Sequence, residues 1–177
     1  MTIRSILFKI SYSLTIGLIL VIFLVGIFFF YLADPLNLRA PKDQILLKVF
    51  HDHREEFEKL QKMALEDLPN VSYFNDSVLN NSKLSRQRQE EYKYLLDKIW
   101  PSLTITIGND DQVLFIFAGG GILSIGPEWS KGIVYKPYDD KSGTIAPNLD
   151  KMRTAPANDY IRPIEPKWFL FYQRYDD

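Results

Sequence analysis

The stretch from Ile10 to Ala33, ISYSLTIGLILVIFLVGIFFFYLA, carries no charged side chain and constrains the fold more than any other part of the chain. An α-helix rises about 1.5 Å per residue, so this stretch would be about 36 Å long, and the hydrocarbon core of a bilayer is about 30 Å thick. We therefore expect a transmembrane helix over residues 10–33, in contact with membrane lipid. A cleaved signal peptide is the alternative, but its apolar core is typically shorter and ends at small residues, whereas this run ends in FFFYLADP.

The expected membrane span divides the rest of the chain. A short basic leader before a single span is typical of a signal anchor with a cytoplasmic N-terminus, although basic residues also follow the span. We expect residues 1–9 to be this cytoplasmic leader and residues 34–41 to be a linker stiffened by Pro35 and Pro41. Residues 42–177 would then form the periplasmic domain of a single-pass inner-membrane protein.

The charge and cysteine content exclude several classes of protein. The chain has 21 Lys and Arg residues against 22 Asp and Glu residues, so it lacks the basic excess that is typical of nucleic-acid-binding proteins. We therefore expect no nucleic-acid partner. The chain has no cysteine, which excludes disulfides, thiolate metal sites and a lipid anchor attached through cysteine.

The first part of the domain predicts two amphipathic helices. In residues 43–68, DQILLKVFHDHREEFEKLQKMALEDL, apolar side chains recur at helical spacing, which predicts one helix of about 25 residues. Its apolar stripe consists of Leu46, Phe50, His53, Phe57, Leu60 and Ala64. A second helix is predicted in residues 82–100, SKLSRQRQEEYKYLLDKIW, with Ser82 or Ser85 as the N-cap. Its inward-facing residues are Leu84, Tyr92, Leu95, Leu96 and Ile99.

After Pro101 the pattern changes from helical to strand-like. The segments LTITI, QVLFIFA, GILSI, GIVYK, YIRPI and WFLFYQRY are short and apolar or alternating, and turn residues such as NDD at 109–111 separate them. Two helices followed by consecutive strands predict an α+β fold, with the helices packed on an antiparallel sheet of about five or six short strands. The polar stretch from 137 to 158 is long for a loop within a compact domain, so we expect it to be functional or poorly ordered.

The segment FAGGGILSIGPEWSKGIVYKP, residues 117–137, raises the question of a phosphate-binding loop. Gly121 and Gly126 have the spacing of such a loop, but Pro127 and Glu128 stand where a lysine and a hydroxyl residue are needed. Proline lacks the backbone amide that would bind the anion, and glutamate repels it. We therefore interpret the three consecutive glycines as a place where the backbone takes positive φ and reverses between two strands.

We expect no catalytic, cofactor-binding or metal site. His51 and His53 would point about 200° apart on a helix, so they cannot bind one ion together. His51 with Glu55, or His53 with Glu56, supplies only two ligands. No G-x-S-x-G nucleophile motif is present, and the carboxylates of NDD and YDD are typical turn residues.

Aromatic residues crowd the last third of the chain, and we expect most of them to pack between the sheet and the helices. Tyrosine and tryptophan are also enriched where one protein docks on another, because they bury a large area at a low entropic cost. We therefore expect an exposed minority to form a recognition patch made of Trp129, Lys131 and Tyr138.

Three segments, FHDHREEFEKLQKMALED, AGGGILSIGPEWSKGIVY and YIRPIEPKWFLFY, resemble a loose group of small membrane-anchored or lipid-anchored proteins of gammaproteobacteria. The resemblance covers most of residues 45–175 and implies a shared domain rather than an activity. Some small exported proteins of this general kind act as immunity proteins against toxins delivered by neighbouring cells.

The sequence therefore favours a non-catalytic periplasmic domain that binds another protein, most concretely an immunity protein that occludes a toxin. Two alternatives stay open at this point. One is a membrane-tethered envelope hydrolase or ligand-binding enzyme that uses residues 139–151 as a lid. The other is an accessory subunit of a membrane complex.

Overall fold

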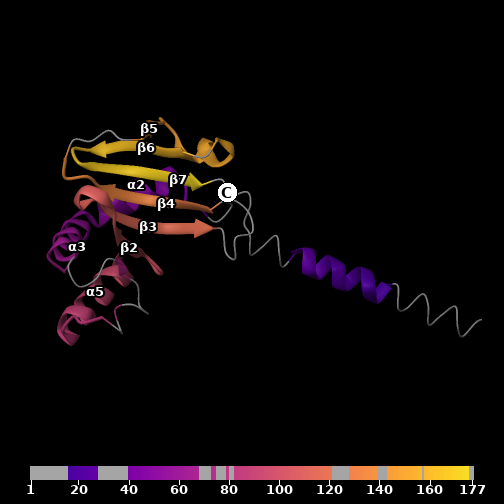
Figure 1. Cartoon of the computed structure of the whole chain (residues 1–177), viewed down its shortest axis with the longest axis horizontal. Coiled ribbons are helices and arrows are strands. Elements are labelled where there is room, and N and C mark those ends of the chain that lie inside the picture. The colour runs from indigo at the N-terminus through magenta and orange to yellow at the C-terminus, as the bar shows by residue number, and fades with distance from the viewer. Residues whose placement is uncertain are drawn as a thin grey trace, which may run out of the picture.

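The computed structural model describes residues 16–27, 40–67, 73–74, 79, 82–120, 128–138, 143–156 and 158–175 of the chain. These residues form an α+β fold, as the sequence predicts, in which helices cover one face of a single sheet (Figure 1).

Seven strands form the sheet. They are β1 (Tyr73–Phe74), β2 (Thr104–Ile107), β3 (Val113–Gly120), β4 (Glu128–Tyr135), β5 (Thr144–Ile145), β6 (Asn158–Glu165) and β7 (Trp168–Tyr175). Their order across the sheet is β1-β2-β3-β4-β7-β6-β5, so β4 is the central strand. Neighbouring strands are antiparallel as predicted, except that β5 pairs in parallel with β6, so the prediction of a purely antiparallel sheet is wrong at this edge. The predicted strand GILSI lies outside the described residues.

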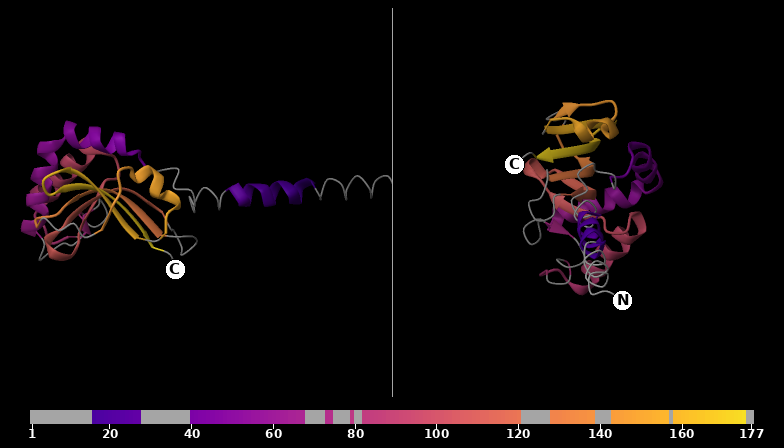
Figure 2. Two further views of the ribbon diagram at one scale, coloured as in Figure 1. Left: turned by 90° about the horizontal axis from the view of Figure 1, so that it is seen from above. Right: turned by 90° about the vertical axis from the view of Figure 1, so that its right-hand side faces the viewer.

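The predicted single helix over residues 43–68 is in fact two helices, α2 (Asp43–Asp52) and α3 (Arg54–Asp67). His53 interrupts them, with φ −123° and ψ 29°. Because of this break, α2 contacts β4 and β7 while α3 contacts β2 and β3. The two helices together therefore follow the curvature of the sheet, whereas a single straight helix would diverge from it (Figure 2). The predicted apolar stripe is confirmed, because Leu46, Phe50, Phe57, Leu60 and Ala64 are buried and His53 is half-buried.

The second predicted helix is α5 (Arg86–Ile99), and Ser85 is its N-cap. The Ser85 hydroxyl accepts a hydrogen bond from the backbone N–H of Arg88 at 3.3 Å, which satisfies one of the free amides at the helix start. The predicted inward-facing residues Tyr92, Leu95, Leu96 and Ile99 are buried, and Leu84 is half-buried. Helix α5 packs against α3.

Residues 16–27 are helical and lie within the predicted span over residues 10–33, whose two ends fall outside the described residues. In the part of the chain that the structure describes, none of the helices combines the length and the apolar character needed to cross a membrane. The predicted leader over residues 1–9 also lies outside that part. Of the predicted linker, Ala40 and Pro41 are described, and both are buried, so the packed domain begins before residue 42.

The turn predicted at NDD is confirmed and joins β2 to β3. Asp110 and Asp111 have φ values of 54° and 58°, and the Gln112 N–H donates to the Asn109 carbonyl at 3.2 Å. Two consecutive residues with positive φ define a type I′ turn, whose twist matches that of a hairpin, and aspartate tolerates this conformation.

Two of the three glycines, Gly119 and Gly120, play a different role from the predicted one. Gly119 and Gly120 lie in β3, and neither has positive φ. Gly120 pairs with Trp129 across the β3–β4 ladder, and a Cβ at Gly120 would lie 2.0 Å from Trp129 Nε1. The glycine therefore leaves room for the indole ring to lie over the strand, which is a packing role. Gly121 lies outside the described residues.

The polar stretch from 137 to 158 is largely structured where it is described. Residues 143–156 contain β5 and a 3₁₀-helix, η3 (Leu149–Thr154), neither of which the sequence predicts. Leu149 is buried in the main core, and η3 contacts β6 and β7. Residues 139–142 and 157 lie outside the described part.

Candidate functional site

The sheet has two apolar faces. Side chains alternate between the faces along each strand. On one face, here called the helix face, residues such as Phe115 and Leu170 share the main core with α2, α3 and α5. Figure 2 shows α2 and α3 on this side of the sheet. The opposite face, here called the cavity face, carries a second buried cluster made of Val134, Ile161, Phe169 and Phe171, with Leu114 and Ile116 packed against it.

A cavity of about 510 Å³ lies on the cavity face. This volume falls within the range of ligand-binding pockets, about 300–1,000 Å³. Its described lining residues are Thr106, Ile107, Gly108, Asn109, Gln112, Leu114, Val134, Lys136, Gly143, Asp159, Tyr160, Ile161, Phe171, Gln173 and Tyr175.

The cavity crosses the sheet diagonally. One end lies at the β2–β3 turn and at Lys136, which directly follows the last residue of β4, Tyr135. The other end lies at Gln173, which pairs with Ser130 near the beginning of β4. A ligand that filled the cavity would therefore contact several strands.

The cavity combines an apolar floor with polar walls. The floor consists of Leu114, Val134, Ile161 and Phe171. The walls consist of polar side chains that strand alternation directs to this face or that lie in the adjoining β2–β3 turn. They are the carboxamides of Asn109, Gln112 and Gln173, the hydroxyls of Thr106 and Tyr175, and the charged groups of Lys136 and Asp159. Such a surface can hold a ligand that has an apolar part and several hydrogen-bonding groups.

The structure separates the predicted recognition patch. Trp129 and Lys131 are only 4% and 1% exposed, whereas Tyr138 is 64% exposed. The prediction that Trp129 and Lys131 lie on the surface is therefore wrong. Both have the same strand parity as Ile133, so all three side chains point to the helix face.

Lys131 belongs to a buried ionic cluster. Its Nζ lies 2.8 Å from Oδ1 of Asp43 and 2.6 Å from Oδ1 of Asp150, and Nη1 of Arg162 lies 3.1 Å from Oδ2 of Asp43. The approach to Asp43 Oδ1 is a close ion pair without the geometry of a hydrogen bond. Two positive and two negative groups balance, as burial of charge requires.

The same cluster fixes α2 and η3 on the central strand. Asp43 is the first residue of α2, and its Oδ2 accepts a hydrogen bond from the backbone N–H of Leu149 in η3 at 2.8 Å. The carboxylate of Asp150 in turn accepts from the backbone N–H of Asp43 at 3.2 Å, where the helix dipole favours a negative charge. In the segment over residues 139–151 that the sequence suggested as a lid, the described residues Leu149 and Asp150 are therefore tied to α2 and β4.

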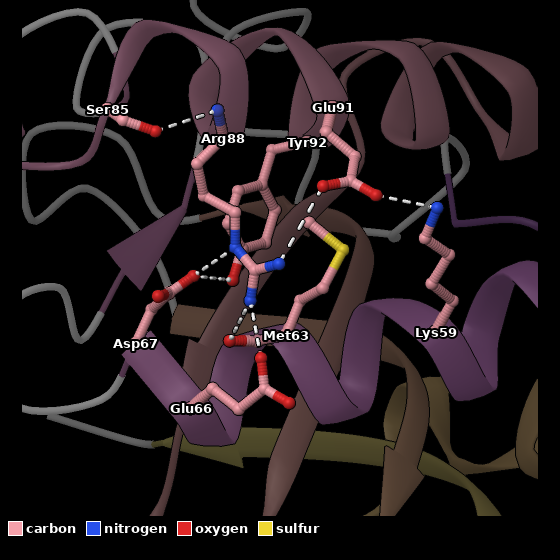
Figure 3. A network of polar contacts seen from close by, with 8 residues as sticks. All are labelled: Lys59, Met63, Glu66, Asp67, Ser85, Arg88, Glu91 and Tyr92. Carbon is pink, nitrogen blue, oxygen red and sulfur yellow. Dashed lines mark hydrogen bonds and ion pairs between the residues drawn. The ribbon is translucent and has the colours of Figure 1, made fainter.

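A second polar network joins α3 to α5 (Figure 3). Arg88 Nε lies 2.8 Å from Asp67, Arg88 Nη2 lies 2.9 Å from Glu66, and the Tyr92 hydroxyl donates to Asp67 at 3.0 Å. Burial alone lowers the pKa of Arg88, but its hydrogen bonds to Asp67 and Glu66 outweigh that effect and raise the pKa above its ordinary value. Burial and the charge of Asp67 raise the pKa of Tyr92 well above its ordinary value. Both groups therefore keep their neutral-pH charge states, which suits a structural role.

The two histidines lie as the sequence indicates. His51 is exposed, His53 is half-buried, and His53 Nδ1 lies 3.8 Å from Glu56. A hydrogen bond from Lys98 lowers the pKa of Glu56. Among the described residues, no group of three or more metal-ligating side chains gathers in one place.

No protein-family model, curated protein or solved structure matches the chain. The candidate site therefore stands on its geometry.

Sequence reasoning missed the cavity, although one signal pointed to it. The segment WFLFYQRY is apolar at consecutive positions, which is typical of a strand that is buried on both faces. Such a strand has apolar side chains on both faces of the sheet. Because helices cover one face, the apolar side chains on the other face indicate that this face also packs against something. The polar walls could not be found in this way, because they come from the β2–β3 turn and from β6 and β7 together.

Proposed function

We propose that the chain is a single-pass inner-membrane protein whose α+β domain lies in the periplasm and binds another protein without catalysing a reaction. The uncharged stretch over residues 10–33, with its helical portion over residues 16–27, supports the membrane anchor. A neutraliser of a toxin that arrives at the membrane, an immunity protein, is the most concrete form of this function.

The observation that carries the proposal is the cavity and the exposed aromatic residues beside it. Tyr175 lines the cavity and is 50% exposed, and Tyr138, which is 64% exposed, lies two residues after Lys136, another lining residue. Exposed tyrosines around a concave apolar floor are typical of protein-binding surfaces. We therefore replace the predicted patch with a docking surface made of Tyr138, Tyr175 and the cavity.

Topology can be tested with single cysteines, because the chain has none of its own. Tyr94→Cys places a thiol at an exposed position on α5. A membrane-impermeant maleimide should label it in intact cells whose outer membrane is permeable to the reagent. Labelling only after the inner membrane is opened would contradict the periplasmic location.

The docking surface can be tested by photo-crosslinking. A photoreactive amino acid at Tyr138 or Tyr175 of the full chain should form a covalent adduct with one protein. The same amino acid at Tyr94, which is exposed on α5 and does not line the cavity, should not. If the adduct is a toxin, cells that lack this chain should die only when that toxin is present. Equal crosslinking from all three positions would contradict the proposed surface.

A further inference from the structure

The chemistry of the cavity walls and floor indicates what kind of segment of a protein partner would fit the cavity. We propose that the cavity binds an extended polypeptide segment that places one apolar side chain on the floor and hydrogen-bonds its peptide groups to the walls. This inference rests on the proposed function, because the segment would belong to the protein partner.

The floor accounts for the apolar side chain. Val134, Ile161 and Phe171 are buried and lie side by side on β4, β6 and β7, with Leu114 from β3 beside them. Their own packing leaves the cavity of about 510 Å³ unfilled. An aliphatic or aromatic side chain that entered it would remove its own apolar surface from water, which is favourable at about 25 cal/mol per Å², whereas Val134, Ile161 and Phe171 are already almost fully buried.

The walls account for the peptide groups. Asn109, Gln112 and Gln173 each present a carboxamide, a group that can donate through its N–H and accept through its oxygen. The Gln173 oxygen already accepts a hydrogen bond from the Ser130 hydroxyl at 3.3 Å, so Gln173 would act on a ligand chiefly as a donor. A peptide group has the same pair of functions, so carboxamides can bond to successive N–H and C=O groups of an extended chain. Asn109 and Gln112 lie at one end of the cavity and Gln173 lies at the other, so the segment would follow the diagonal.

The charges of the walls favour a segment without net charge. The described lining residues include one cation, Lys136, and one anion, Asp159. A phosphate or a polyanion needs several positive groups, and these walls do not provide them.

An acyl chain fits less well than a peptide. It offers no hydrogen bonds, so it would bury the carboxamides of Gln112 and Gln173 without replacing the water that they lose. Polar groups that are buried in this way disfavour binding, and a lipid-binding cavity is typically apolar on all sides.

The test uses the full chain in lipid nanodiscs and a phage-displayed library of random heptapeptides as the probe. We expect enrichment of peptides that share one apolar residue flanked by uncharged residues. The double variant Gln112→Leu and Gln173→Leu should weaken binding of an enriched peptide about tenfold, because two wall hydrogen bonds are lost. Gln87→Leu, at an exposed position on α5, is the matched control and should bind like the unmodified chain.

The contrary outcomes are separable. Enriched peptides that bind the double variant and the control equally would overturn the inference, and so would a failure to enrich any peptide motif. A fluorescent fatty acid that binds the chain and is displaced by no peptide would assign the cavity to an amphiphile instead. If the peptides fail while Tyr138 and Tyr175 still crosslink to a protein, the inference fails and the proposed function survives. Circular dichroism of the three proteins would confirm that each is folded.

Discussion

Lys131 pairs with two acidic side chains and Arg88 pairs with three, but water reaches the two basic groups to very different extents. The side chain of Lys131 is 1% exposed and pairs with Asp43 and Asp150, whereas that of Arg88 is 23% exposed and pairs with Glu66, Asp67 and Glu91. Between Lys131 and Asp43, which are 1% and 4% exposed, water cannot replace a missing partner. In the Arg88 network, solvent can take over part of the lost hydrogen bonding. The number of ion pairs therefore says less about stability than the cost of leaving one partner alone.

The largest effect is expected at Lys131. Lys131→Met should lower the free energy of unfolding by about 3–5 kcal/mol, because it leaves the buried carboxylate of Asp43 with less compensation. Urea denaturation of the full chain in detergent, followed by tryptophan fluorescence, measures this. Lys98→Met, at a side chain that is 45% exposed, is the matched control and should cost much less. Equal losses from the two variants would show that burial of the lysine does not set the cost of removing it.

Removal of Arg88 should have an intermediate effect. Arg88→Met should lower the free energy of unfolding by about 1–2 kcal/mol, since hydrogen bonds to Asp67 and Glu66 are lost but water reaches both acids. The same denaturation measurement applies. A loss as large as that of Lys131→Met would show that the α3–α5 network behaves as a buried cluster.

The Arg88 network also predicts a pH dependence. The pKa of Tyr92 is raised above 10.0 in the folded state, so its contribution to stability is fully present below pH 10.0 and is lost as the pH rises beyond that value. Tyr92→Phe should cost about 1 kcal/mol at about pH 8, where the hydrogen bond to Asp67 is lost. The difference between the two proteins should narrow by about pH 11, as urea denaturation at both pH values would show. A constant difference would mean that Tyr92 is not shielded from solvent as described.

The smallest effect is expected at the surface. Arg86 pairs with Glu90 one turn along α5, and the two side chains are 91% and 65% exposed. Arg86→Ala should change the free energy of unfolding by about 0–0.5 kcal/mol, because such pairs are well solvated. In the same urea measurement, we expect this variant to lose the least stability of the four. A loss of unfolding free energy larger than that of Arg88→Met would contradict the expected order.

Local patterns predicted much of the fold. The helical spacing of Leu46, Phe50, Phe57 and Leu60 identified the buried side of the first helices, and the NDD sequence identified a turn. The interruption at His53 left no such pattern, because it arises from the curvature of the sheet beneath. Strand β5 was missed for a similar reason, since two residues that pair with β6 carry no periodic signal of their own.

The candidate site was less predictable than the fold. Lys131 looked like a surface residue because lysine is rarely buried, and its partners Asp43 and Asp150 are far away in the sequence. Strand parity with Ile133 would have placed it inside. The cavity depends on residues from five segments, which only the folded sheet brings together.

The attachment of Asp43 bears on how the domain responds to mechanical load. A force applied to the chain ahead of Ala40 would reach the domain at the start of α2, where Asp43 is held to Lys131 on the central strand. A pull at the middle of a sheet must break many contacts at once, whereas a pull at an edge strand can peel it away bond by bond. Such a force would therefore load the central strand β4 rather than an edge strand of the sheet.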